Sequence, residues 1–441
     1  MKAREIFLVL LIIGIGVFTY YAKTGKLDIE WDGSDWSWLL PGEEFVFEET
    51  QEITAPLPPE IQVINSHGSV EIQGVETEKI SISFKKSIYR KNKEEAQKVA
   101  DKLKMAINRE EPRLILSTNR NEFQRKNFET HFKISVPAGT EVAVKNSYGL
   151  VKTVKTKNAH IANSHGEVQA LDIGGQLIIS NSYEDVTIIN VEADCRVTSR
   201  HSKVSATNVQ GELVLDHSYG EVELENIGKK VSLNGSYSRL TGKVLKGEVE
   251  VESSYRPIIL SEAGPTTIRG RHSDIEAKGI SGPLEITDTY AQLRLNNIKG
   301  NLKIEGTNME IWADSVLADE IFVTSSYENV EILSFKGKTT VLLTHGDLAL
   351  EPESVTGPID VQASYASIRF GWPAGGKFPF EARTKSGNIQ WNLADKPSLE
   401  ETNGQSVTKA FLDESGKPSI RLSTSYGDIR VEETSRSLKS I

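Results

Sequence analysis

A short polar motif that recurs about every 18 residues constrains the fold of this chain more than any other feature. The motif is clearest at Asn146-Ser147-Tyr148-Gly149, and its third residue serves as a marker that can be followed along the chain. The marker falls at Tyr148, His165, Tyr183, His201, Tyr219, Tyr237, Tyr255, His272, Tyr290, Asn308, Tyr327, His345 and Tyr365. Outlying copies at His67, Ser386 and Tyr426 extend the repeat over most of the chain.

Apolar residues keep a constant position relative to the marker. The residue three beyond it is always aliphatic, as Val222 is after Tyr219, and the residues six and four before it are mostly apolar, as Leu213 and Leu215 are. Spacing by two is the period of a β-strand. A turn rich in Asn and Gly, such as Asn226-Ile227-Gly228, separates the strands. Each repeat is therefore predicted to hold two short strands and two turns.

A unit of this size cannot bury its apolar face alone, so successive units must stack. Stacked coils pair their strands in parallel about 4.8 Å apart, and the run of markers then spans about 58 Å. The repeat is too short for a propeller blade and lacks the leucine-rich repeat frame. We therefore predict an all-β protein, a parallel β-solenoid (β-helix) with about 18 residues per coil, in which Leu213, Leu215, Val222 and Leu224 are buried.

The repeat lapses between residues 84 and 131, where one inserted helix is predicted near the N-terminal end. Apolar residues follow a helical period over 92–108, Asn92 and Glu95 fit a capping pair, and Glu111-Pro112 limits extension of the helix. The predicted domain organisation is a membrane anchor at 1–23, a juxtamembrane linker and first edge at 24–60, N-terminal coils at 61–145, a regular solenoid at 146–370, and C-terminal coils with a looser closing segment at 371–441.

The first residues predict a membrane segment. Lys2 and Arg4 precede an uncharged apolar run at 6–21, which is typical of a transmembrane helix. A cleaved signal peptide is the alternative, but Tyr20 places a bulky ring where a small residue is wanted before the cut. The bias of basic residues predicts a single-pass protein of the cell membrane with its N-terminus in the cytoplasm and its solenoid outside, in the periplasm or at the cell surface.

Charge and cysteine content exclude several classes of function. The formal net charge is -10, from 51 basic and 61 acidic residues, and no Lys/Arg block is long enough to make nucleic acid an expected partner. The single cysteine, Cys195, rules out an internal disulfide and a thiolate-rich zinc site. It occupies a core position of its repeat and is predicted to be a buried thiol.

Local catalytic motifs are absent from the sequence, so no catalytic residue and no cofactor is predicted. His165 and His201 lie two coils apart, about 9.6 Å, which is too far for both to bind one zinc ion, and no metal site is predicted. The residues two beyond each marker, such as Glu221 and Arg239, have mixed charge and are expected to form a solvated row.

The markers themselves are the candidate ligand-binding residues. Rings repeated at one position of a solenoid form a ladder that suits sugar faces or flat protein partners, although rings that only stack and cover the corner of the core explain the pattern as well. The candidate residues are Tyr148, His165, Tyr183, His201, Tyr219, Tyr237, Tyr255, His272, Tyr290, Tyr327, His345 and Tyr365.

Three segments carry a resemblance to a known family: residues 131–142 (HFKISVPAGTEV), 146–149 (NSYG) and 424–429 (TSYGDI). They resemble the bacterial putative-adhesin family of β-strand-repeat domains, whose function is largely unknown, and the similarity covers residues 45–435. The resemblance implies an extracytoplasmic parallel β-solenoid that is often tethered to a membrane. This chain departs from the family by carrying Tyr or His at the marker, where a small polar residue is usual.

The sequence therefore favours a non-enzymatic, membrane-anchored, adhesin-like or scaffolding solenoid outside the cytoplasm. A carbohydrate-active β-helix enzyme and a self-assembling structural rod are the alternatives. The expected partners are the membrane, through residues 6–21, and a glycan or a cell-envelope protein, and self-association is left open.

Overall fold

The computed structural model describes residues 42–434 apart from 396, 403 and 415. The membrane anchor predicted at 1–23 lies outside the described residues. Within the described part of the chain, no helix is both long and apolar enough to cross a membrane.

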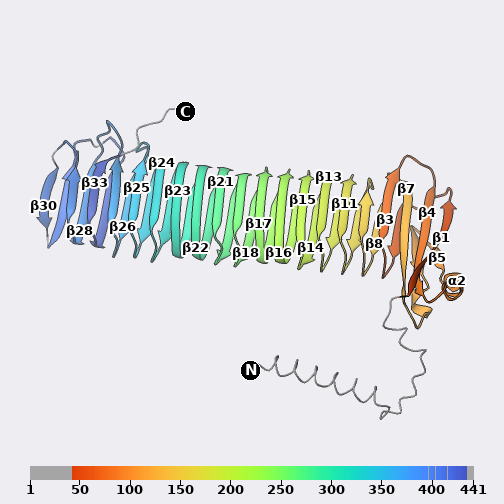
Figure 1. Ribbon diagram of the computed structural model, residues 1–441. Helices are drawn as coiled ribbons and strands as arrows, with labels where there is room; N and C mark the ends of the chain where they lie inside the picture. Colours follow the sequence, from red (N-terminus) through yellow and green to blue (C-terminus); the bar gives the residue numbers. More distant parts are fainter. Residues whose placement is uncertain (1–41, 396, 403, 415, 435–441) are drawn as a thin grey trace, which may run out of the picture.

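The described residues form a long rod of stacked coils, as the repeat predicts (Figure 1). Strands of successive coils pair in parallel at an offset of one repeat, so that Val204 lies opposite Val222 and Val222 opposite Leu240. The regular part of the rod contains β8 (Glu141–Lys145), β9 (Val151–Val154), β10 (Ala159–Ala162), β11 (Val168–Ile173), β12 (Leu177–Ser180), β13 (Val186–Val191), β14 (Cys195–Arg200), β15 (Lys203–Val209), β16 (Leu213–Ile227), β17 (Val231–Leu245), β18 (Val249–Ser254), β19 (Ile258–Ala263), β20 (Thr266–Arg271), β21 (Ile275–Ser281), β22 (Leu284–Lys299), β23 (Leu302–Ser325), β24 (Val330–Leu343), β25 (Leu348–Pro352), β26 (Ile359–Ala363) and β27 (Ile368–Trp372).

One continuous hydrophobic core runs along the rod, because every coil turns its alternate apolar residues inward. Leu213, Leu215, Val222 and Leu224 are at most 2% exposed, which confirms their predicted burial. Cys195 is also buried in this core, as predicted.

Each coil bends at two corners. The first corner carries the marker, and the second lies between the strand that follows the marker and the next coil. At the second corner Asp172, Asn190, Asn208 and Asn226 have positive φ, a conformation that Asn and Asp adopt more readily than most residues. Their side chains form a hydrogen-bonded ladder in which each amide donates to the side-chain oxygen one coil earlier, over 2.7–2.9 Å. The Asn-rich turns of the sequence thus link neighbouring coils.

At the N-terminal end the chain does not add coils in sequence order. The elements here are β1 (Glu43–Ile53), β2 (Glu60–Ile64), β3 (Val70–Val75), β4 (Ile80–Arg90), α2 (Lys93–Lys102), β5 (Met105–Glu110), β6 (Arg113–Thr118), a 3-10 turn (Arg120–Glu122) and β7 (Phe128–Pro137). Strand β2 pairs with β6 and β8, and β3 pairs with β7 and β9, so the coil formed by β2 and β3 is an inner layer. Antiparallel strands β4 and β1 then cover β7.

The inserted helix is shorter than predicted. Asn92 caps it as expected, since its side-chain oxygen accepts a hydrogen bond from the Glu95 amide over 2.9 Å, but the helix ends at Lys102 and not near Asn108. Residues 105–110 form β5 instead, antiparallel to β6, with Ile107 opposite Leu116. Ile107 fits the helical period of the sequence, but it does not belong to the helix. Pairing with β6 satisfies the backbone hydrogen-bonding groups of this segment, so the segment forms a strand.

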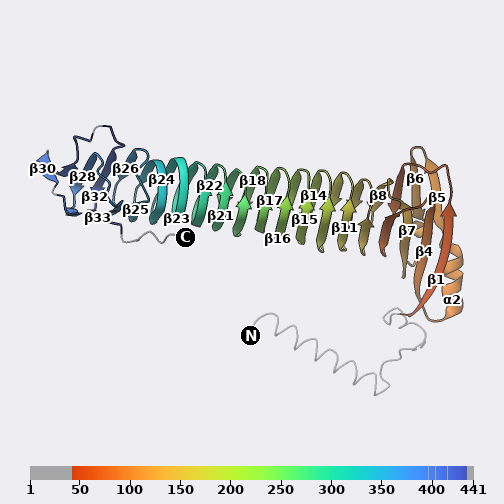
Figure 2. The same cartoon turned by 90° about the horizontal axis from the view of Figure 1, so that it is seen from above.

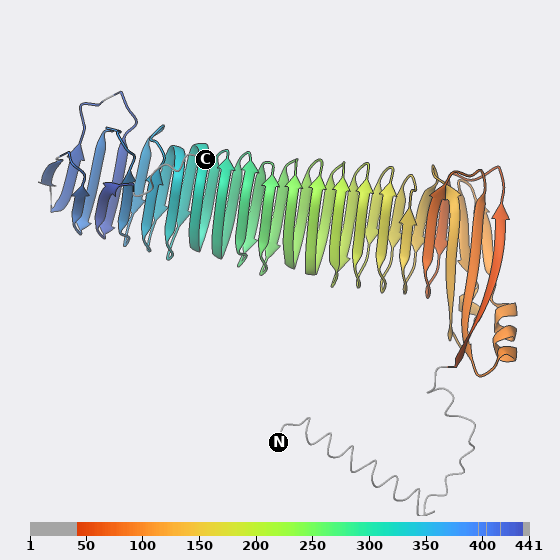
Figure 3. The same cartoon turned by 45° about the horizontal axis from the view of Figure 1, so that its top comes forward.

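The C-terminal end repeats the same arrangement with β28 (Phe380–Ser386), β29 (Ile389–Asn392), β30 (Ser398–Thr402), β31 (Gln405–Ala410), β32 (Ile420–Tyr426) and β33 (Ile429–Glu433). The last coil in sequence, β32 and β33, lies between β26 and β27 on one side and β28 and β29 on the other. The antiparallel strands β31 and β30 cover β28. The described part of the predicted loose closing segment is therefore largely strand. Figures 2 and 3 show both ends, with β1 and α2 at one and β30 at the other.

Candidate functional site: an exposed ladder of stacked rings

The markers lie at the first corner of successive coils, and their rings form a ladder along the rod. Ten rings stack in one run from His67 to Tyr290, with neighbouring ring centroids 4.5–5.6 Å apart. After Asn308 the stacking resumes through Tyr327, His345, Tyr365 and Tyr426 at 4.7–4.9 Å. All twelve predicted candidate residues therefore belong to one ladder.

Two rings of the ladder, His67 and Tyr426, were visible in the sequence as outlying copies of the motif but were not among the candidate residues. Both are brought in by the permuted order of the terminal coils. Tyr148 stacks on His67, which comes from the coil of β2 and β3, and Tyr365 stacks on Tyr426 from the last coil in sequence. A search for the corner motif alone would have identified both residues, because neither lies 18 residues from the next marker in the sequence.

The tyrosines of the ladder are exposed, but mainly at their edges. They keep between 41% and 60% of their surface accessible. From Tyr148 to Tyr290 the planes of neighbouring rings differ by at most 15°, so each ring covers the faces of its neighbours. Within the run, a sugar has no free ring face to stack on. The ladder instead presents ring edges, phenol hydroxyls and imidazole nitrogens.

Two kinds of backbone corner hold the rings. In the first kind, a buried Asn two residues before the marker supports the corner, as when Asn146 donates to the carbonyl oxygens of Gly68 and Tyr148, each over 3.1 Å. In the second kind, the marker itself has positive φ, as at Tyr219 (61°) and Tyr237 (55°). A left-handed conformation costs a residue with a Cβ atom about 1–2 kcal/mol, so ring stacking must offset strain in these coils.

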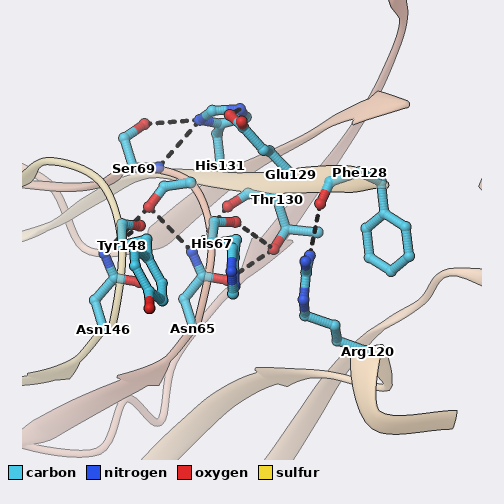
Figure 4. A network of polar contacts seen from close by, with 11 residues as sticks. Asn65, His67, Ser69, Arg120, Phe128, Glu129, Thr130, His131, Asn146 and Tyr148 are labelled. Carbon is cyan, nitrogen blue, oxygen red and sulfur yellow. Dashed lines mark hydrogen bonds and ion pairs between the residues drawn. The ribbon is translucent and has the colours of Figure 1, made fainter. Parts of the chain in front are cut away.

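A polar network closes the N-terminal end of the ladder (Figure 4). Asn65 donates to the carbonyl oxygen of Thr130 over 2.8 Å and accepts from the Thr130 hydroxyl over 2.7 Å. Arg120, which is buried, donates to the carbonyl oxygen of Phe128 over 2.7 Å. Burial, followed by the positive charge of Arg120, lowers the pKa of His67. The His67 ring at the N-terminal end of the run thus lies against a network of buried hydrogen bonds, although its own Nδ1 is buried without a hydrogen-bond partner.

Beside the ladder the surface carries the row of mixed charge that the sequence predicts. Several acidic and amide residues of this row accept a backbone N–H from the next coil, as Asp274 does from Gln292 over 3.0 Å and Asn329 does from Asp347 over 2.8 Å. These residues therefore contribute to the stacking of coils.

The two larger recesses along this row have different chemistry. One of about 470 Å³ lies near the C-terminal end and contains Arg369, which is already paired with the buried carboxylate of Glu351 and with Glu331 at 3.7 Å. The other, of about 560 Å³, is lined by Tyr219, Gly220, Glu221, Tyr237, Arg239, Arg256 and Pro257. Within the described residues, Arg239 and Arg256 are exposed and form neither an ion pair nor a side-chain hydrogen bond. The second recess thus offers free guanidinium groups next to tyrosine edges.

Cys195, Asp288 and His217 are titratable residues that lie buried within the coils. Burial raises the pKa of the Cys195 thiol to about 12, which leaves it an unreactive core residue. Burial also raises the pKa of Asp288 to about 6, against hydrogen bonds from backbone groups that lower it. His217 has a lowered pKa, chiefly through burial, and its Nε2 donates to the carbonyl oxygen of Ser202 over 3.1 Å.

Within residues 42–434, excepting the gaps named above, no group of three or more His, Cys, Asp or Glu side chains is placed to hold a metal ion.

These features define the class of protein: a parallel β-solenoid with interleaved end coils and an exposed column of stacked rings. The chain belongs to the toastrack family, DUF4097, a family of unknown function whose pattern matches residues 59–236 and 230–432. Among solved structures, the chain is similar to a protein described as a putative cell adhesion protein from Clostridium sporogenes, with 10% identity over 88% of this chain and 100% of the other, at a TM-score of 0.16. Among curated proteins no match was found.

Proposed function

We propose that this protein is a membrane-anchored rod outside the cytoplasm that binds an acidic glycan of the cell envelope along its ring ladder, without catalysing a reaction. The observation that carries the proposal is the recess of about 560 Å³ where the edges of Tyr219 and Tyr237 meet the unpaired Arg239 and Arg256. Guanidinium groups bind carboxylates through paired hydrogen bonds, and phenol hydroxyls donate to and accept from sugar hydroxyls.

The period of the rod supports a linear partner. Hydroxyl groups and imidazole nitrogens recur at each coil, with ring centroids near 5 Å apart over the run. A polymer lying parallel to the rod meets the same edge at each step, so weak contacts add along its length. The covered ring faces mean that hydrogen bonding and charge, more than ring stacking, carry this interaction.

The anchor and the orientation of the rod rest on the sequence. The apolar run at 6–21, preceded by Lys2 and Arg4, supports an uncleaved anchor with the described rod outside the cytoplasm. Membrane fractionation of the full chain and of a variant lacking residues 1–23 tests this proposal. The full chain is expected in the membrane fraction and accessible to external protease, and the shortened chain in the soluble fraction. Protection of the full chain from external protease contradicts the orientation.

The binding proposal is tested with a glycan array that contains uronic acid polymers and neutral polymers. The full protein is compared with Arg239→Gln, Arg256→Gln and the Arg196→Gln control, since Arg196 is exposed on the strand before the corner and does not line the recess. Each recess arginine is expected to contribute about tenfold to affinity, the usual value of a hydrogen bond to a charged group, and the control variant is expected to bind normally.

Other outcomes separate this proposal from its alternatives. Equal binding of neutral and acidic polymers, or unchanged binding by both recess variants, contradicts the proposed recognition of acidic glycans. Release of oligosaccharides by the wild-type protein identifies an enzyme instead. Filaments that grow with protein concentration identify a structural rod, although the antiparallel strands β1 and β30 cover both ends of the solenoid in the described residues.

A further inference from the structure

The ladder is interrupted at one marker between Tyr148 and Tyr365. Asn308 occupies the position of a ring, and the stacked pairs end at His272–Tyr290 on one side and begin again at Tyr327–His345 on the other. Tyr290 and Tyr327 are the most exposed tyrosines of the ladder, at 60% and 59%, because each has one face that no neighbouring ring covers. The two ring faces that bound this interval are therefore open, unlike those within the two stacked runs.

The backbone at the interruption is the same as in the neighbouring coils. Asn308 has a φ of 54°, compared with 60° at Tyr290 and 71° at Tyr327. The flanking residues keep their register, with Thr289 opposite Thr307, and the Asn308 amide donates to the carbonyl oxygen of Ser326 over 2.8 Å. The coil is thus neither displaced nor bulged at its corner. Only the ring is missing.

The size of the interval follows from the spacing of the coils. Tyr290 and Tyr327 are two coils apart, about 9.6 Å, and a ring placed midway lies about 4.8 Å from each. That distance falls within the 4.5–5.6 Å at which both phenol and imidazole rings stack elsewhere in the ladder. The ladder therefore shows which shape fits: one planar ring, either five- or six-membered.

The chemistry of the interval favours a ring with a polar edge. The Asn308 side chain is partly exposed and has no hydrogen-bond partner among the described residues, which leaves both a donor and an acceptor available. Glu310 is exposed two residues further on, and the recess at Tyr219, Glu221 and Tyr237 shows that this position faces the same surface as the rings. A ring bearing an N–H or O–H group finds acceptors there.

We propose that the interval at Asn308, bounded by Tyr290 and Tyr327, is a binding site for one planar aromatic ring with a polar edge. The bound ring completes the ladder, with one tyrosine face on each side and its polar edge toward the Asn308 amide. Free heteroaromatic molecules and exposed aromatic side chains of a partner polypeptide share this chemistry. The site is independent of the glycan recess, which lies in other coils.

The first test titrates the full-length protein, carrying ring-labelled tyrosine, with 4-methylphenol and 4-methylimidazole, the side-chain analogues of the missing rung. We expect saturable shifts of the Tyr290 and Tyr327 ring signals, at one ligand per chain. The non-planar 4-methylcyclohexanol, of similar size, is expected to bind at least tenfold more weakly. Equal binding of the planar and non-planar probes, or no saturable shift with either planar probe, overturns the proposal.

Variants give a matched pair of controls. Asn308→Tyr fills the interval with the residue that other corners carry at the same φ, and is expected to abolish the shifts. Tyr219→Asn removes a ring within the long run and uses the residue that the chain itself places at such a corner, so it is expected to raise the stoichiometry to two. Unchanged binding in Asn308→Tyr, or a stoichiometry that stays at one in Tyr219→Asn, contradicts the ring-sized site.

Two further arms define the ligand. Asn308→Gly keeps the interval and the backbone conformation but removes the amide, and is expected to weaken 4-methylimidazole binding by about fivefold or more while the stacking remains. A capped tripeptide with a central tyrosine shows whether a ring attached to a polypeptide also enters: its binding favours a protein source, and exclusion of the tripeptide with retention of the free rings favours a small molecule. Loss of glycan binding in the recess variants leaves each of these outcomes unchanged.

Discussion

The strain at the marker predicts an unusual order of stability between two substitutions. Tyr237 has a φ of 55° and stacks on Tyr219 at 5.1 Å and Tyr255 at 4.8 Å. Tyr237→Ala and Tyr237→Gly both lose these two stacking contacts, about 0.5–1.5 kcal/mol each, for a total of about 1–3 kcal/mol. The two variants differ only in the free energy that the backbone conformation at residue 237 contributes.

Alanine keeps the left-handed strain of about 1–2 kcal/mol, and glycine removes it but loses about 0.4–1 kcal/mol through the greater freedom of the unfolded chain. Tyr237→Gly is therefore expected to be more stable than Tyr237→Ala by about 0.5–1 kcal/mol. Tyr148 provides the control, because its own φ is not positive and Gly149 takes the left-handed conformation (105°) instead. At Tyr148 the order is expected to reverse, with alanine the more stable variant.

Amide hydrogen exchange measures the opening free energy of the coils around each site, and does not require the whole chain to unfold in one step. The prediction concerns the sign of the glycine-minus-alanine difference at two positions of the same ladder. The same sign at both positions contradicts the assignment of strain to the marker in one kind of corner and to the following glycine in the other.

Three further predictions concern the buried groups and the ends. Because the pKa of Asp288 is about 6 in the folded protein and 3.8 in the unfolded chain, the folded state binds the proton more tightly, and stability is expected to fall as pH rises from 3.8 through about 6. Asp288→Asn should remove this slope and be the more stable protein at neutral pH in urea unfolding; a wild-type slope in the variant would assign the effect elsewhere. For His217 the folded pKa is lowered, so its contribution to stability is expected to be lost as pH falls below 6.5, and His217→Gln should unfold with a weaker dependence in that range. Removal of residues 411–441 takes away the inner coil of β32 and β33, which lies between β26 and β28 in the sheet. This deletion is expected to abolish amide exchange protection in residues 380–410 as well, because β28 then has no coil to pair with. Protection that persists in residues 380–410 would show that the outer coil docks without the inner one.

Much of the candidate site was predictable from sequence, because successive side chains of a β-strand point alternately to its two faces. Once Val222 and Leu224 point inward, the position of Tyr219 at a corner follows, and every copy of the motif repeats it. The break at Asn308 is likewise visible as one letter in the repeat. The sequence does not show that this break exposes two ring faces. That conclusion needs the distances between ring centroids, which show that the rings between Tyr148 and Tyr290 cover one another.

The length of the inserted helix shows where local pattern fails. Ala96, Ala100 and Leu103 lie on one helical face and pack in a small separate core with Ile88 and Phe128. The next apolar residue in that period, Ile107, instead pairs with β6, since a free strand edge nearby offered its backbone hydrogen bonds. A hydrophobic period in the sequence indicates which face of a segment is apolar. It does not indicate whether a neighbouring strand will form hydrogen bonds with the backbone of that segment.

The sequence by itself determined the single coil. The length of the coil, its two strands, its inward residues and the ring at its corner all depend on contacts between equivalent positions of similar units. Only the tertiary structure decided the order of coils at the two ends, where β2 pairs with both β6 and β8 and β32 with both β26 and β28. The physical reason is that all coils share one pattern, so each can pair locally with any other. The choice between layer orders is a difference in the free energy of the whole assembly, set by which arrangement leaves antiparallel strands over both open edges.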